Sequence, residues 1–156
     1  MKRTIRPITL VLIAFAMFVV SAAPAANAQL CSISGAVGAY GFTATGTLLP
    51  STGPVLIAAV GRINLRLDGS LDGTEARNVG GDFANETLKG TWTVNPSCTG
   101  TVTAQIFESG VLVRTSVLSF VIDDNQQEVR SVQKSLTLPD GTKVPAVVTF
   151  EAKRMF

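Results

Sequence analysis

Short runs in which apolar and polar residues alternate fill this chain from residue 38 almost to its end. Ile63, Leu65 and Leu67 alternate with Arg62, Asn64 and Arg66, and similar runs recur further along the chain. Side chains on a β-strand point alternately to its two faces, whereas an amphipathic helix repeats every 3.6 residues. Residues 29–156 contain no window with a convincing helical period. The alternation therefore predicts an all-β fold.

Turn sequences such as Asp68-Gly69-Ser70, Gly80-Gly81 and Pro139-Asp140-Gly141 separate these runs. They delimit about eight expected strands, near residues 38–47, 55–67, 71–79, 83–94, 100–107, 111–122, 128–137 and 143–154. The connections are too short for parallel crossovers, which need a dozen or more residues. We therefore expect each strand to lie antiparallel to the next.

Antiparallel strands with one apolar face can hide their edges by closing into a barrel. We expect a closed eight-stranded barrel, and a two-sheet sandwich is the alternative. Pro145 falls inside the last expected strand, which indicates that the start of this strand is an edge or a bulge.

The turn at Asp68-Gly69 allows two registers. A two-residue turn would pair Arg62 with Glu75, whereas a three-residue loop would set Leu67 opposite Leu71. We expect the longer loop, because apolar residues then face apolar residues and a slip of one residue would exchange the faces of one strand.

The first 28 residues have the pattern of a secretory signal peptide. Lys2, Arg3 and Arg6 precede an uncharged apolar run over residues 8–20, and Ala26-Asn27-Ala28 provides a small-x-small cleavage site. The run is too short to cross a bilayer comfortably as a permanent helix. We expect a signal helix over residues 1–28, cleavage after Ala28, and one barrel domain over residues 29–156 that is secreted or periplasmic and has no stable membrane insertion.

The charge of the mature chain limits its partners. Without its first 28 residues the chain has ten basic and eleven acidic residues, which gives a net charge near −1. Such a balance does not favour nucleic acid or an anionic membrane surface. The oligomeric state is left open.

Cys31 and Cys98 are the only cysteines, and both would enter an oxidising compartment. A disulfide between them is the expected state, and free thiols or metal-binding thiols are the alternatives. A lipid-anchored Cys31 is disfavoured, because Leu30 stands where lipoprotein processing requires a small residue.

The chain contains no histidine, so Ser-His-Asp catalysis, Cys-His catalysis and His-based zinc sites are impossible within it. We expect no catalytic residue, no metal site and no cofactor. Glu75 or Glu86 would become a candidate for isomerase-type catalysis only if it pointed into the barrel.

Tyr40 and Trp92 have two interpretations. They are core aromatics, or they form a platform for a small apolar ligand at the mouth of a pocket. Small residues on the strands either leave room for a cavity or mark bends of the sheet; they are Gly41, Ala44, Ala58, Ala59, Gly61, Gly73 and Gly90.

A resemblance to known proteins rests on motifs spread over residues 31–122. These are Cys31, Tyr40-Gly41-Phe42, Gly46, Pro50, Gly61-x-Ile63, Asp68-Gly69, Leu71-x-Gly73 and the run from Gly90-Thr91-Trp92 to Cys98-Thr99-Gly100. The chain resembles small exported bacterial β-proteins of unknown function, which are similar to the eight-stranded barrel of allene oxide cyclases and more distantly to lipocalins. The resemblance implies a barrel. Its motifs are glycines and turns, so no site residue is carried over.

These observations favour an exported, non-catalytic barrel that binds a small apolar ligand or a protein partner. The alternatives are a cyclase or isomerase with few catalytic side chains and a small outer-membrane barrel. The terminal Phe156 suits a membrane barrel, but one Trp and one Tyr cannot form its aromatic girdles.

The expected disulfide predicts the thiol reactivity of the mature protein. A thiol reagent added to the unfolded, unreduced protein should label neither Cys31 nor Cys98, and reduction should expose both, as mass spectrometry would show. Full labelling before reduction would contradict the prediction.

Overall fold

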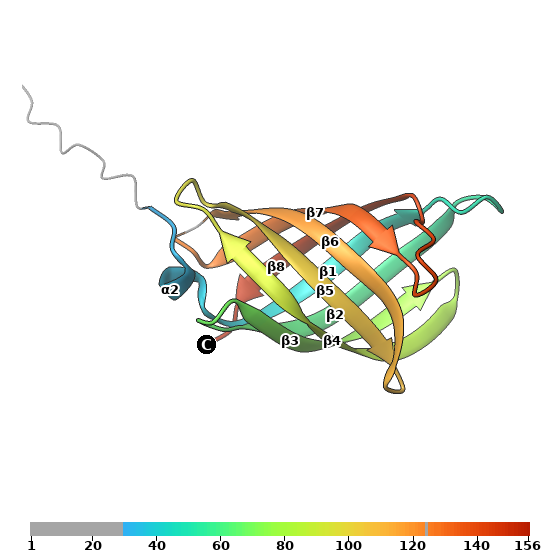
Figure 1. Cartoon of the computed structure of the whole chain (residues 1–156), viewed down its shortest axis with the longest axis horizontal. Helices are drawn as coiled ribbons and strands as arrows, with labels where there is room; N and C mark the ends of the chain where they lie inside the picture. The colour runs from blue at the N-terminus through green and yellow to red at the C-terminus, as the bar shows by residue number, and fades with distance from the viewer. Residues whose placement is uncertain (1–29, 124) are drawn as a thin grey trace, which may run out of the picture.

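The computed structural model describes residues 30–123 and 125–156, which form one short helix and a closed barrel of eight strands (Figure 1). The predicted signal peptide and its cleavage site at Ala28 lie outside the described residues. The strands are β1 (Gly38–Leu48), β2 (Val55–Leu65), β3 (Ser70–Val79), β4 (Asp82–Val94), β5 (Thr99–Glu108), β6 (Val111–Asp123), β7 (Glu128–Thr137) and β8 (Ala146–Arg154). The helix α2 (Ile33–Ala36) precedes β1 at one end of the barrel.

Each strand pairs antiparallel with the next, and β1 pairs with β8 to close the barrel. The closing ladder runs from Tyr40 opposite Arg154 to Leu48 opposite Ala146. The predicted all-β antiparallel barrel is confirmed, and the sandwich alternative is wrong. Closure gives each of the eight strands a hydrogen-bonded neighbour on both sides.

The ladder between β7 and β8 is the shortest of the eight in the barrel wall. Their ladder holds only five residue pairs and ends at Val132 opposite Thr149, after which Thr137 and Lys143 form an isolated bridge. Strand β8 starts after Pro145, three residues later than its expected start at residue 143. The first three residues of β8 pair with β1 and not with β7, and Pro145 just before them has no N–H to donate to a ladder.

The register at Asp68-Gly69 differs from both expected registers. Leu65 lies opposite Leu71 and Arg62 opposite Thr74, so the expected pairing of Leu67 with Leu71 is wrong by two residues. Strand β2 therefore ends at Leu65, and the exposed Leu67 belongs to the turn. A shift of two residues preserves the faces, and Leu65 and Leu71 are both buried.

The helix end of the barrel is filled by side chains. Tyr40 and Trp92 are almost fully buried there, in one cluster with residues such as Leu65, Phe120 and Ile122. The indole Nε1 of Trp92 donates to the Arg66 carbonyl, and the Tyr40 hydroxyl donates to the Ala36 carbonyl at 2.9 Å. Buried Trp and Tyr need such partners for their polar atoms. Both aromatic side chains are therefore part of the packed core at this end.

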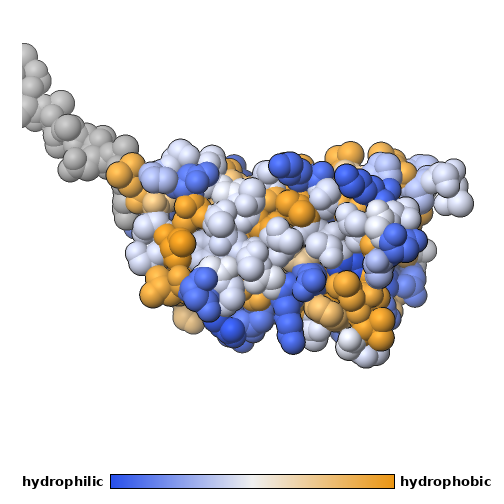
Figure 2. All heavy atoms as spheres, viewed as in Figure 1, coloured by the Kyte–Doolittle hydropathy of each residue, from blue (hydrophilic) through white to orange (hydrophobic). Residues whose placement is uncertain are grey.

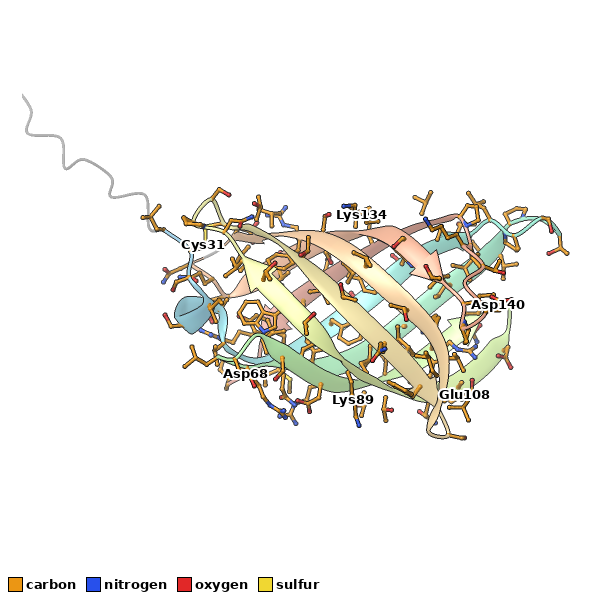
Figure 3. All side chains as sticks on the ribbon, in the orientation of Figure 1. Cys31, Asp68, Lys89, Glu108, Lys134 and Asp140 are labelled. Carbon is orange, nitrogen blue, oxygen red and sulfur yellow. A yellow bond between two sulfur atoms is a disulfide. The ribbon has the colours of Figure 1, made fainter. Side chains whose placement is uncertain are left out.

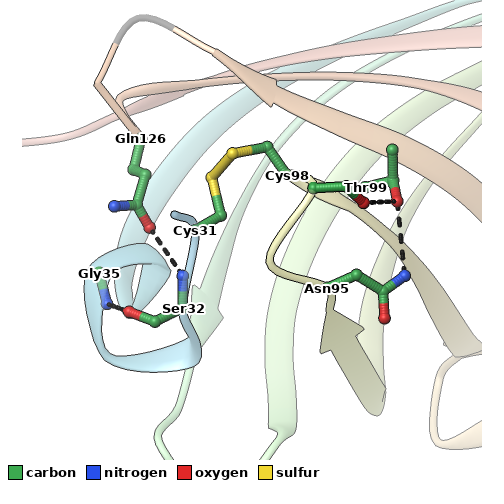
Figure 4. Close-up of a disulfide and its surroundings, with 8 residues drawn as sticks. Cys31, Ser32, Gly35, Asn95, Cys98, Thr99 and Gln126 are labelled. Atoms are coloured by element: carbon green, nitrogen blue, oxygen red, sulfur yellow. Dashed lines mark hydrogen bonds between the residues drawn. A yellow bond between two sulfur atoms is a disulfide. The ribbon is translucent and has the colours of Figure 1, made fainter. Parts of the chain in front are cut away.

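Helix α2 plugs this end and is fastened to it (Figure 4). A disulfide joins Cys31 to Cys98 in the β4–β5 turn, with 4.9 Å between their Cα atoms, as the compartment argument predicts. Ser32 caps the helix by accepting from the Gly35 amide, and its own amide donates to Gln126 Oε1. The disulfide to the β4–β5 turn and the hydrogen bond to Gln126 thus hold a helix that is too short to be stable alone.

Burial of Trp92 predicts a large loss of stability when the ring is removed. Trp92→Ala should lower the free energy of unfolding by about 3–5 kcal/mol, the usual range for a large core aromatic. Urea unfolding would measure the change. Because Trp92 is the only tryptophan, its emission should also be blue-shifted from that of indole in water, and an unshifted spectrum would contradict burial.

Candidate functional site

The half of the barrel away from α2 is hollow. A cavity of about 550 Å³ runs among all eight strands there, a volume within the range of small-molecule sites. The apolar side chains on its two walls form separate clusters, one around Ala44, Ala59 and Val148 and another around Leu88, Ala104 and Ile106. The walls do not meet in a single core, because the cavity lies between them.

Small inward-facing residues explain part of this space. Ala44, Ala59 and Ala104 line the cavity from three different strands. Gly61 and Gly90 act differently, because a Cβ at either position would lie within 2.4 Å of a carbonyl oxygen on a neighbouring strand. These glycines permit the tight bending of the wall. Both interpretations therefore hold for some of these positions. The expectation is wrong for Ala58, which is exposed on the outer face of β2, because its place in the alternation is one residue from the inward-facing Ala59.

Two glutamates lie inside the barrel opposite each other. Glu75 of β3 and Glu86 of β4 are paired positions, and their side chains are 5% and 0% exposed. Arg114 of β6 reaches both: its Nη2 lies 2.7 Å from Glu75 Oε1, and it donates to both oxygens of Glu86. Both glutamates therefore point into the barrel, which is the condition under which either is a candidate for isomerase-type catalysis.

Arg77 extends this cluster to the mouth of the cavity. Its Nε donates to Glu86 Oε1 at 2.9 Å, and its Nη atoms pair with Asp82 and Glu108. Asp82 is largely exposed and Glu108 half-buried at the rim, and Figure 3 shows Glu108 at the end of the barrel opposite Cys31. The charged cluster (Glu75, Arg77, Asp82, Glu86, Glu108 and Arg114) thus connects the interior to solvent.

The two buried glutamates differ in pKa. Burial raises the pKa of Glu75 to about 7; Arg114 opposes this shift, and the neighbouring Glu86 adds to it. Burial also disfavours ionisation of Glu86, but hydrogen bonds from Arg114 and Arg77 outweigh it and hold its pKa below the usual value. At neutral pH Glu86 is an anion, while Glu75 is balanced between its two forms.

The predicted site residues fall at the other end of the barrel. Tyr40 and Trp92 lie in the cluster under α2 and are not among the residues that line the cavity. Their role in ligand binding stays a prediction. Cys31 and Cys98 lie at the same end, in the disulfide.

Sequence reasoning missed Arg77 and Arg114 and named Glu75 and Glu86 only conditionally. A signal was present, because Glu86 is two positions from Leu88 and so shares the inward face that Leu88 and Trp92 define. Glu75 and Arg77 likewise share the face of Leu71. Arg114 was harder to find, since a bulge beside Ile106 and Phe107 shifts the register next to it.

In the described part of the chain, no three His, Cys, Asp or Glu side chains are grouped so that they could hold a metal ion. Over the same residues, no helix has the length and apolarity needed to span a bilayer.

Comparisons with known proteins identify the fold and no family. No family model and no curated protein matches the chain. A solved structure described as a de novo designed fluorescence-activating β-barrel shares 14% identity with a TM-score of 0.51, covering 79% of this chain and 96% of that one. Another, described as EF1p2_mFAP2b bound to DFHBI, shares 14% identity with a TM-score of 0.52 and covers 80% of this chain and all of that one. At this identity the likeness shows an eight-stranded barrel fold alone.

The raised pKa of Glu75 predicts how the stability of the protein depends on pH. The folded state binds this proton more tightly than the unfolded state, so ionisation between about pH 4.5 and 7 destabilises the fold. Gln cannot ionise. Glu75→Gln should therefore gain stability relative to the parent between pH 5 and 8.5, by on the order of 2–3 kcal/mol at about 1.4 kcal/mol per pKa unit.

Urea unfolding of both proteins at the two pH values measures this difference. Glu151→Gln removes the same charge from the exposed outer face of β8 and serves as the control, with little change expected. A Glu75→Gln effect that is the same at pH 5 and 8.5 would contradict the assigned pKa shift.

Proposed function

We propose that the mature chain is an exported β-barrel that binds a small, mainly apolar ligand in its cavity. The observation that carries the proposal is the cavity of about 550 Å³, whose lining is mostly apolar and includes a few convergent polar groups. Such a lining is typical of ligand sites in barrels. The neighbour described as bound to DFHBI supports the proposal, because it is a barrel of this fold with a small molecule bound.

The proposal includes export and residues 1–28 as a signal peptide. The disulfide between Cys31 and Cys98 supports it, because disulfides persist in oxidising compartments. The secreted and periplasmic locations are equally compatible with this bond.

The outer surface does not favour the outer-membrane alternative. Lys89, Glu151 and Lys153 lie on exposed outward positions of β4 and β8, and Figure 2 shows a face on which hydrophilic and hydrophobic residues are interspersed. Transmembrane barrels have an apolar outer band and a polar interior. The outer face of this barrel is mixed instead, and most of its cavity lining is apolar.

An isomerase-type enzyme is the second candidate, and one observation favours it. Glu75 lines the cavity with a pKa near 7, a value suited to proton transfer at neutral pH. We place it second, because the nearest charged groups are committed to ion pairs with one another. If it were an enzyme, Glu75→Gln would retain ligand binding and lose turnover.

A neutral fluorescent probe tests the proposed binding. N-phenyl-1-naphthylamine should brighten when added to the folded protein, since its emission increases in apolar surroundings. Ala59→Leu, which fills the cavity, should weaken probe binding at least several-fold, whereas Ala58→Leu on the adjacent outward position should not.

Thermal unfolding of both variants would verify that each is folded. The absence of brightening, or equal binding by both variants, would contradict the proposal. Native mass spectrometry of protein taken from its host would identify a retained ligand directly.

A further inference from the structure

The polar end of the cavity holds more negative than positive groups. Four carboxylates and two guanidiniums are joined by ion pairs in the charged cluster. The cluster has a net charge of −2 when every group is ionised. The remaining polar residues of the cavity lining, Ser116, Ser131 and Gln133, are neutral.

The arginines of the cluster neutralise the two buried glutamates unequally. Glu86 accepts three hydrogen bonds, two from Arg114 and one from Arg77, whereas Glu75 accepts one from Arg114. Glu75 is also part of the cavity lining, and Glu86 is not. The carboxylate that a bound molecule meets is thus the one with the weakest cationic support.

This arrangement discriminates between charged ligands. An anionic head group would enter a region that already has an excess of carboxylates, and the two guanidiniums are held by Glu86, Asp82, Glu108 and Glu75. A cation would instead give Glu75 a second positively charged partner beside Arg114. A buried carboxylate gains more from such a partner than an exposed one, because little water screens the pair.

The carboxylates at the mouth of the cavity also favour a cationic ligand. The exposed Asp82 and the half-buried Glu108 lie at the mouth, where their negative charge raises the local concentration of cations. A cationic ligand is therefore attracted at the entrance and paired further inside.

We propose that the ligand of this cavity is an apolar molecule with a single protonated amine, whose ammonium group lies beside Glu75 while its apolar part fills the space between the two walls. This inference rests on the proposed function and adds the chemical class of the ligand.

Three probes with the same ten-carbon chain test it: decylamine, 1-decanol and decanoate, each used below its aggregation concentration and measured by isothermal titration calorimetry at pH 8. Decylamine should bind at least tenfold more tightly than 1-decanol, and decanoate more weakly than 1-decanol.

Substitution and pH locate the effect at Glu75. In Glu75→Gln the affinity for decylamine should fall to that for 1-decanol, with 1-decanol itself unaffected, and Glu151→Gln should behave as the parent. The charged groups that face Glu75 are Glu86, Arg77 and Arg114, with Glu108 beyond them. Glu75 ionises near pH 7, so decylamine should bind up to about tenfold more tightly at pH 8 than at pH 6. An alkylammonium remains charged over this range.

The outcomes separate the two proposals. If none of the three probes binds, the proposed function fails. If 1-decanol binds but decanoate binds as tightly as decylamine or more tightly, the cavity site stands and the amine preference is overturned. A decylamine preference that persists unchanged in Glu75→Gln would also overturn the inference.

Discussion

The hydrogen-bonded ladder between β1 and β8 determines everything else in this molecule. It joins the first and last strands and turns a sheet into a closed wall, which fixes the number of strands around the lumen. Eight strands leave a lumen that side chains can just fill or that can hold one small ligand. The size of the inward-facing side chains then decides whether each part of the lumen, along the barrel axis, is filled or hollow. Large aromatics fill the α2 end, and alanines leave the other half hollow.

The charged cluster is costly in this setting. Moving carboxylates and guanidiniums out of water requires several kcal/mol per ion, and apolar residues of similar size often stabilise a fold better. The cluster does not occupy the packed half of the barrel, where it would only replace good packing. It lines the hollow half, where the neutral and ionised forms of Glu75 are both accessible near pH 7. In this position the cluster is accessible to a molecule that enters the cavity, as the proposed ligand binding requires.

Local patterns in the sequence predict most of the fold and little of the site. Alternation and turn residues locate all eight strands to within a few residues, because each depends on a short stretch of chain. The expected register at Asp68-Gly69 differs from the observed one by two residues. The expected and the observed register bury the same faces of both strands, and only the geometry of the turn distinguishes them. The Arg114–Glu75 pair joins positions 39 residues apart and depends on the bulge beside Ile106 and Phe107. Such a pair cannot be inferred until every register between the two strands is known.

The disulfide has a consequence for the order in which the molecule can assemble. Chain synthesis proceeds from the N-terminus, so Cys31 is made 67 residues before Cys98. Oxidation to the native bond must wait until strands β1 to β4 have been made, and the ladder of β1 with β8 must wait for the last strand. Both cysteines are therefore present while β5 to β8 are still to be made, so the bond that fastens α2 can form before the barrel closes. The seam between β1 and β8 is consequently the last of these links for which both partners exist, because β8 is the last strand of the chain to be made.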